Sequence, residues 1–381
     1  MNQRERFIAS LKHQKTDHVL FNPGSPGPAV LANWHTQGFP ESVNGAEWYA
    51  YMKKQLGLEF EHDWMKVQPG VNFEMIPSFA VKIIEKKNGI LVVQNSIGTI
   101  CEIAAEHEAY ITAGKGIPDY IGQKYVRHPV RNREDWERMK TRYNPDDPSR
   151  FPVDFEERCR KMDVSQRTTI VASGMPGMFW TLRDWLGFEN LCIALSEEPA
   201  FIHEMVRFYS DFCSAVLEKT VQKVQLDWFV FAEDMAYKGH SMISPSMIRE
   251  FIMPAWKRWA DILSSSGCPL INVDSDGYVA ELIPLWIEAG INSNNPVEVA
   301  AGNDLVAYRK QFGTQMGYIG GVDKRAIVAG GETLRREMKR VAPAVRAGGY
   351  IPMCDHGFPP ELTWPNALEY CRQLAELTGW L

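Results

Sequence analysis

Short apolar runs alternate with helix-patterned segments along the C-terminal two-fifths of the chain. Each run is typical of a buried strand, and each following segment repeats apolar residues at helical spacing and ends near a glycine. Repeated strand–helix units of this length predict a parallel sheet, because parallel strands need helical crossovers. The strands predicted in this region are 228–232, 269–273, 291–294, 316–320 and 350–354.

Three earlier segments, 18–22, one near 63–71, and 168–172, bring the number of predicted strands to eight. Eight parallel strands close readily into a barrel, so we predict an α/β fold, a (β/α)8 TIM barrel, as a single domain over 1–381. An N-terminal helical segment begins at Asn2, which forms a capping-box pattern with Glu5. Residues around 77–104 alternate about Asn88-Gly89 and predict a β-hairpin inserted into the barrel.

The composition narrows the class of protein. Of the 381 residues, 45% are hydrophobic and 23% charged, which is typical of a soluble globular protein. A net charge of −6 argues against nucleic-acid binding. The chain has neither an apolar run long enough for a bilayer nor a secretion-signal pattern, so we expect no membrane association and a cytoplasmic location. Seven cysteines without a CxxC pair predict free thiols.

Polar side chains follow the predicted strands directly. In an α/β barrel the chemistry lies at the carboxyl ends of the strands. Like charges that converge there are unfavourable unless a cation or a proton intervenes. We therefore expect either a metal ion or carboxyl groups with raised pKa values that suit acid–base work. The residues concerned are Asp234, Asp274, Asp276, Asn295, Glu298, Lys324 and His356.

Some of these residues have a plainer interpretation. Asp276 would also serve as the N-cap of a helix beginning at Tyr278, and Glu298 would serve as a later cap. Asp355-His356 would equally form a surface turn. Asp274 is the residue least easily given a structural role, because Asp276 would already supply the cap.

Five fragments carry a family resemblance in combination: NQRERFIASLKHQKTDHV (2–19), ISPSMIREFIMPAWKR (243–258), DSDGYVAELIPLWIEAGINSNNPVEVAAGNDL (274–305), IGGVDKRAIVAGG (319–331) and GGYIPMCDHGFPP (348–360). Together they resemble the uroporphyrinogen decarboxylase (URO-D)-like superfamily, and within it the methyltransferase-like branch. The resemblance implies a (β/α)8 barrel. It also implies either porphyrinogen decarboxylation or exchange of a methyl group with a corrinoid carried on a separate protein.

Two departures from the family pattern restrict this choice. The decarboxylases carry an arginine-rich segment after the first strand, whereas residues 21–30 here contain no arginine, so porphyrinogen decarboxylation is not expected. The thiol-methylating members carry His-x-Cys-Gly after the fifth strand, where this chain has Asp-Ser-Asp-Gly at 274–277. The resemblance then implies zinc or another divalent metal held by Asp274, Asp276 and His356, with Cys354 as an alternative ligand.

The resulting functional prediction is a corrinoid-dependent methyltransferase. It would demethylate a small methoxylated aromatic substrate (O-demethylation) and pass the methyl group to a separate corrinoid-binding protein. The predicted catalytic residues are Asp274, Asp276, His356 and Asp234. The predicted substrate-binding residues are Trp180, Tyr278, Asn295, Glu298 and Lys324.

Two alternatives stay open at the level of sequence. The first is a decarboxylase or lyase of a small acid, which Lys324 or Arg325 would bind. The second is a ligand-binding barrel without catalysis. The sequence also leaves open the identity of the methyl donor and acceptor and whether the chain forms a homodimer.

Overall fold

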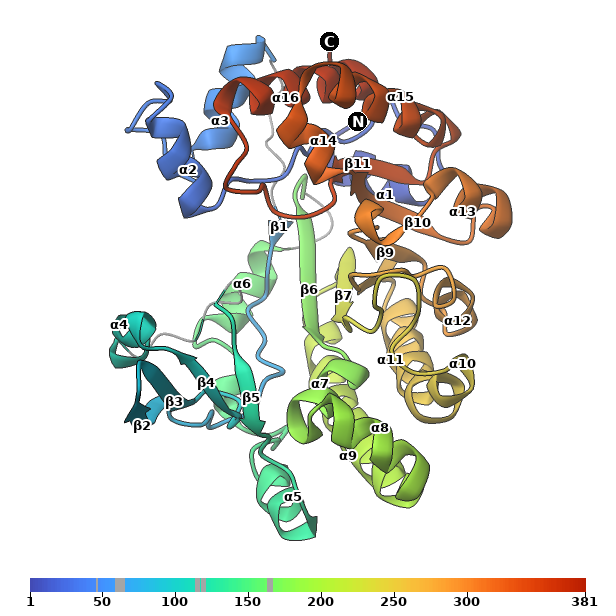
Figure 1. The fold of residues 1–381 in the computed structure, drawn as a ribbon. Coiled ribbons are helices and arrows are strands. Elements are labelled where there is room, and N and C mark those ends of the chain that lie inside the picture. Colours follow the sequence, from blue (N-terminus) through green and yellow to red (C-terminus); the bar gives the residue numbers. More distant parts are fainter. Residues whose placement is uncertain (46, 59–65, 114–116, 118–120, 163–166) are drawn as a thin grey trace.

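A curled parallel sheet organises the molecule (Figure 1). The computed structural model describes residues 1–381 except 46, 59–65, 114–116, 118–120 and 163–166. Among the described residues, seven strands pair in parallel in the order β1-β6-β7-β8-β9-β10-β11. Their bounds are β1 (Lys66–Val67), β6 (Ile170–Pro176), β7 (Trp228–Ala232), β8 (Leu270–Asp274), β9 (Ser293–Asn295), β10 (Gly317–Val322) and β11 (Tyr350–Cys354).

Helices connect successive strands from β6 to β11, as the strand–helix rhythm predicts. The α-helices are α1 (Gln3–Leu11), α2 (Pro28–His35), α3 (Trp48–Leu56), α4 (Glu108–Thr112), α5 (Arg133–Lys140), α6 (Phe155–Lys161), α7 (Met178–Leu186), α8 (Phe188–Glu197), α9 (Pro199–Val221), α10 (Pro245–Met247), α11 (Met253–Ser265), α12 (Ile283–Glu288), α13 (Leu305–Phe312), α14 (Lys324–Ala329), α15 (Gly331–Ala347) and α16 (Trp364–Thr378).

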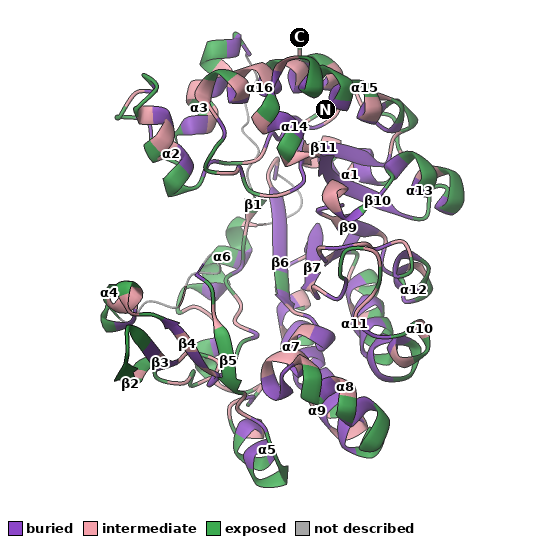
Figure 2. Ribbon diagram, in the orientation of Figure 1, coloured by how far each residue is buried: buried purple, intermediate pink, exposed green. Residues whose placement is uncertain are grey.

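The inner face of the curled sheet is closed at one end by α1. Phe7 and Leu11 of this helix pack in one buried cluster with inward-facing strand residues, among them Ile170, Leu270 and Ile351. The predicted capping box at the start of α1 is present, since Asn2 and Glu5 exchange side chain–backbone hydrogen bonds. The parallel strands are buried nearly throughout (Figure 2). The opposite end, where the carboxyl ends of the strands lie, is called the mouth below.

The prediction of eight strands closed into a barrel is met only in part, because the described residues form a curled parallel sheet of seven strands. The predicted strand at 18–22 is wrong: Leu20 and Phe21 are buried, but the backbone N–H of Val19 donates to Thr378 of α16 instead of to a strand. The predicted segment near 63–71 contains β1, although residues 63–65 lie outside the described residues. A run of apolar residues therefore predicted burial correctly but not the hydrogen-bonding partner.

The predicted hairpin lies in a second, antiparallel sheet. β2 (Lys82–Lys87) and β3 (Ile90–Gln94) are joined by a two-residue turn at Asn88-Gly89, with φ of 49° and 78°. That is the positive-φ geometry for which this dipeptide is favoured. The sheet continues with β4 (Ile100–Ala104) and β5 (Lys124–Arg127), beyond the predicted 77–104, and lies beside β6 and α7 (Figure 1).

Helix boundaries follow proline and glycine. α15 ends at Ala347, directly before Gly348, and Pro254 lies in the first turn of α11, immediately after a π-helical segment at Ile248–Ile252. The helix predicted from Tyr278 instead begins at Ile283, with Pro284 in its first turn. None of the described helices has the length and apolarity that crossing a bilayer requires.

Candidate active site

Asp274 ends β8 on the inner face of the sheet. Along the strand, Leu270 belongs to the inner cluster and Ile271 and Val273 to the core under the helices, so alternation turns Asp274 inward. Its carboxylate accepts a hydrogen bond of 2.8 Å from Asn295 at the end of β9. Burial, and then the charges of Asp234 and Asp276, raise the pKa of Asp274 to about 7. The carboxyl can therefore hold or release a proton near neutrality.

Asp234 joins this inner carboxyl from the end of the neighbouring strand β7, and Asp276 joins it from the loop that follows β8 itself. Asp234 follows β7 with a φ of 40°, and its Oδ1 accepts the backbone N–H of Asp276 at 3.1 Å. Burial is the first cause of the raised pKa of Asp234, and the charge of Asp276 adds to it. Because α12 begins only at Ile283, Asp276 is not a helix cap and its side chain is available for another contact.

His356 lies between two carboxylates. Its Nε2 is 3.3 Å from Oδ1 of Asp276, and its Nδ1 is 3.5 Å from Oδ1 of Asp355. These two partners raise the pKa of His356 to about 10, which keeps the ring protonated at neutral pH. Asp355 is fully buried, so the alternative of a surface turn does not hold.

Backbone contacts fix the loop that carries these groups. Oε2 of Glu298 accepts the N–H of Gly277 at 2.9 Å, so Glu298 holds the loop and makes no side-chain cap. A Cβ on Gly277 would lie 2.3 Å from the carbonyl oxygen of Ala236, and φ there is +83°, so the loop requires glycine. Asp355 accepts the backbone N–H of Lys324 at 3.2 Å, which ties β11 to the start of α14.

Glu233, next to Asp234, has a structural role. It is fully buried and accepts three backbone N–H groups at the start of α7, from Met178, Phe179 and Trp180. The indole of Trp256 donates a fourth hydrogen bond at 2.5 Å. Glu233, from the end of β7, thus accepts the backbone N–H groups at the start of α7 that have no partner within the helix.

A cavity of about 580 Å³ lies at the same end of the sheet as Asp234. Pro176, the last residue of β6, forms part of its wall. Arg183 connects the two places, because it lines the cavity and donates a 3.0 Å hydrogen bond to the backbone oxygen of Asp234. Its guanidinium also lies 4.7 Å from the ring centroid of Trp180, the predicted substrate-binding residue that lines the cavity.

Sequence reasoning missed most of this cavity. Burial raises the pKa of Asp184 to about 7 and also raises that of Glu74. Both carboxyls line the cavity with the aromatic rings of Tyr125 and Phe188. Asp184 and Arg183 follow Trp180 within one helix, a signal that was present in the sequence but not at a strand end.

The predicted site residues therefore fall into two groups. Those that the structure connects through contacts at the mouth are Asp234, Asp274, Asp276, Asn295, Glu298, Lys324 and His356. Trp180 lines the cavity, whereas Tyr278 is outside its lining and lies near Gly302. The catalytic and substrate-binding roles of these residues stay predictions.

The predicted metal ligands do not fit an ion in this arrangement. Within the described ranges, no three or more His, Cys, Asp and Glu side chains are grouped so as to hold a metal. The two ring nitrogens of His356 each face a carboxylate, Nε2 that of Asp276 at 3.3 Å and Nδ1 that of Asp355 at 3.5 Å. Cys354 is buried in the core under the helices, and burial raises the pKa of its thiol to about 12.

Comparison with solved structures identifies the fold. A methyltransferase from Methanosarcina mazei matches 99% of this chain and 99% of its own, with a TM-score of 0.56 and 14% identity. A B12-independent methionine synthase from Shewanella sp. W3-18-1 matches 59% of this chain and 65% of its own, with a TM-score of 0.35 and 14% identity. A putative vitamin-B12-independent methionine synthase from Listeria monocytogenes matches 96% and 98%, with a TM-score of 0.36 and 7% identity.

The family is established by sequence. No curated protein matches the chain significantly. Residues 116–374 match the family model described as uroporphyrinogen decarboxylase (URO-D). This match extends over well more than half of the 381 residues, and the chain accordingly belongs to the uroporphyrinogen decarboxylase family.

Proposed function

We propose that this chain is a methyltransferase that removes a methyl group from a small methoxylated aromatic substrate and passes it to a corrinoid on a separate protein. The observation that carries the proposal is that one mouth holds both Asp274 at the end of β8, hydrogen-bonded to Asn295, and His356, whose ring lies between Asp276 and Asp355. The fold shared with the Methanosarcina mazei methyltransferase is consistent with it.

Demethylation of an ether leaves an alkoxide, which is a poor leaving group unless it is protonated or its charge is stabilised. Asp274 carries a proton for a large fraction of the time near pH 7 and can give it to that oxygen. The positive charge of His356, held between Asp276 and Asp355, stabilises the developing negative charge. A reduced corrinoid, when its carrier protein is bound, supplies the nucleophile that takes the methyl group.

The cavity beside the mouth is the proposed location of the aromatic ring. Its volume of about 580 Å³ is in the range of small-molecule sites, roughly 300–1,000 Å³. Trp180 and Phe188 supply faces against which a ring can pack. Because Arg183 lines the cavity and contacts the backbone of Asp234, the cavity adjoins the loop that carries this carboxyl group.

The alternative of a decarboxylase or lyase has less support. It relied on Lys324 or Arg325 to bind a small acid, but the guanidinium of Arg325 is paired with Asp323 at 2.7 Å. We also propose a cytoplasmic location, since all seven cysteines are free thiols and most are buried.

The proposal is tested by mixing the purified chain with a panel of methoxylated aromatics and a Co(I) corrinoid protein. Transfer of the methyl group is followed as loss of the Co(I) absorbance. Asp274→Asn should slow transfer by roughly a hundredfold or more, while Asp261→Asn, an exposed carboxylate on α11, should not change it. Failure of the wild-type chain with every donor, or full activity of Asp274→Asn, would refute the proposed chemistry.

A further inference from the structure

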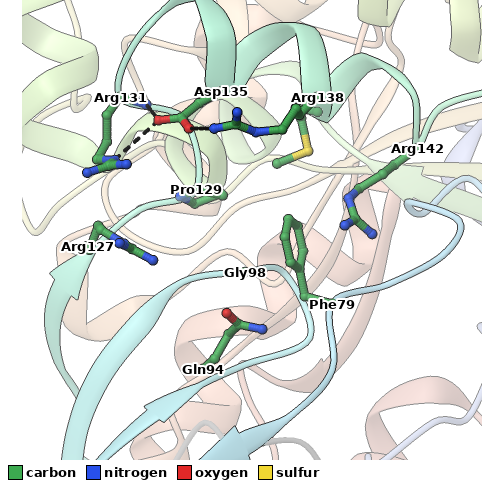
Figure 3. Close-up of a pocket in the computed structure, with 10 residues that line it drawn as sticks. Phe79, Gln94, Gly98, Arg127, Pro129, Arg131, Asp135, Arg138 and Arg142 are labelled. Atoms are coloured by element: carbon green, nitrogen blue, oxygen red, sulfur yellow. Dashed lines mark hydrogen bonds and ion pairs between the residues drawn. The ribbon is translucent and has the colours of Figure 1, made fainter. Parts of the chain in front are cut away.

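Four arginines line a second pocket, remote in sequence from the carboxyl groups of the mouth. The pocket holds about 230 Å³ and lies between the antiparallel sheet and α5. Arg127 comes from the end of β5, Arg131 and Arg138 from just before and within α5, and Arg142 from just after it (Figure 3). This concentration of positive charge occurs on a chain whose net charge is −6.

The carboxylates around the pocket neutralise only part of this charge. Asp135 pairs with Arg131 at 3.2 Å and with Arg138 at 2.5 Å. Arg138 also pairs with Glu134. Among the described residues, neither Arg127 nor Arg142 forms an ion pair with a carboxylate. Four guanidinium groups against two carboxylates leave a charge of about +2 for a ligand to meet.

The guanidinium of Arg142 is held in place by an aromatic ring and a backbone hydrogen bond. Arg142 lies 3.8 Å from the ring centroid of Phe79 and donates to the backbone oxygen of Pro77 at 2.5 Å. The Phe79 ring itself lies against Gly98, where an added Cβ would be 2.7 Å from ring atoms. A stacked guanidinium keeps its remaining N–H groups in one plane, which reduces the ordering cost of binding an oxyanion.

The charge and the size of the pocket together indicate the ligand. A volume of about 230 Å³ is below that of most sites for drug-sized ligands, so the pocket suits a compact group. A monocarboxylate would neutralise one guanidinium, whereas a phosphoryl group carries close to two negative charges and accepts forked hydrogen bonds from several arginines.

We infer that this pocket binds the phosphoryl group of a small phosphorylated molecule or of inorganic phosphate. The inference goes beyond the proposed methyl transfer and does not depend on it. Arg127 and Arg142 supply charges that no carboxylate of the described residues pairs with, Arg131 supplies a partly paired one, and Gln94 of β3 supplies an amide at the pocket wall. Figure 3 shows these side chains around the pocket, with the ion-paired Asp135 at its edge.

The test is isothermal titration calorimetry of the full chain with pyrophosphate, inorganic phosphate, glycerol phosphate and acetate. Pyrophosphate should bind and acetate should not, and added NaCl should weaken binding. Arg127→Ala and Arg142→Ala should each weaken pyrophosphate binding roughly tenfold, because each removes a charge-assisted hydrogen bond. Arg372→Ala, an exposed arginine of α16, is the matched control and should bind like the wild type.

The relative affinities for glycerol phosphate and inorganic phosphate identify the kind of ligand. Tighter binding of glycerol phosphate than of phosphate assigns a phosphorylated organic ligand, and equal binding assigns free phosphate. No binding by the wild-type chain, equal binding of acetate, or unchanged affinity in Arg127→Ala would overturn it. Arg142 packs on Phe79 and its loss can affect folding. Arg127 is exposed at a strand end, so its variant, checked by circular dichroism, is decisive.

Discussion

Replacement of Asp274 by asparagine should stabilise the fold, and increasingly so as the pH rises. In the folded chain the pKa of this carboxyl is about 7, whereas in the unfolded chain it is about 3.9. The folded state therefore binds the proton more tightly. Stability from this group is undiminished below about pH 4, falls as the pH rises toward 7, and stays constant above it.

The size of the effect follows from the pKa. One pH unit across this window corresponds to about 1.4 kcal/mol, so the ceiling above pH 7 is about 4 kcal/mol. Partial access to solvent lowers this, and we expect about 2–4 kcal/mol at pH 8. Asparagine removes the titration but can still accept the hydrogen bond from Asn295.

Urea unfolding at pH 5, 6, 7 and 8 measures the difference in free energy of unfolding between Asp274→Asn and the wild type. The difference should grow with pH up to about 7 and then level off. Asp261→Asn, on the exposed surface of α11, controls for the general effect of removing a negative charge and should show no such rise. A difference that is flat across this range, or a variant less stable than the wild type at pH 8, would refute the reasoning.

Three further outcomes are expected. His356→Gln should destabilise the fold most at pH 6 and least near pH 10. The protonated ring stabilises the folded chain fully below about pH 6.5, and this stabilisation is lost as the pH rises to the folded-state pKa of about 10. Thermal unfolding across this pH range measures the difference between variant and wild type. Glu233→Ala should lower the free energy of unfolding by at least about 3 kcal/mol in urea, since the buried N–H donors of α7 and Trp256 lose their acceptor. Trp180→Ala should raise KM roughly tenfold with little change in kcat in the methyl-transfer assay, as expected for a wall of the substrate cavity.

Strand positions and the residues at strand ends could be predicted from the sequence, because they depend on the local pattern of apolar and polar residues. The strands at 228–232 and 350–354 have the predicted bounds, which the apolar runs indicate. Because the carboxyl ends of parallel strands share one edge, Asp274 and His356 were predicted to be neighbours of the same opening, although 82 positions separate them.

Features that could not be predicted from the sequence depend on hydrogen-bonding and packing partners that lie far away along the chain. Residues 18–22 have the pattern of a strand, but the backbone N–H of Val19 donates to a helix instead of to a strand. Glu233 and Asp234 are adjacent and chemically alike, yet one caps a helix inside the core and the other faces the mouth. The arginine pocket also lies outside any motif, because its residues come together only when α5 packs beside the antiparallel sheet.

The packing of α1 under the parallel sheet has a consequence for synthesis of the protein. Phe7 and Leu11 leave the ribosome long before Ile351 of β11, which belongs to the same buried cluster. The cluster that buries α1 therefore stays incomplete, with part of the apolar side of the helix uncovered, until β11 has been translated. A chaperone that shields this helix on the nascent chain would protect folding during that interval.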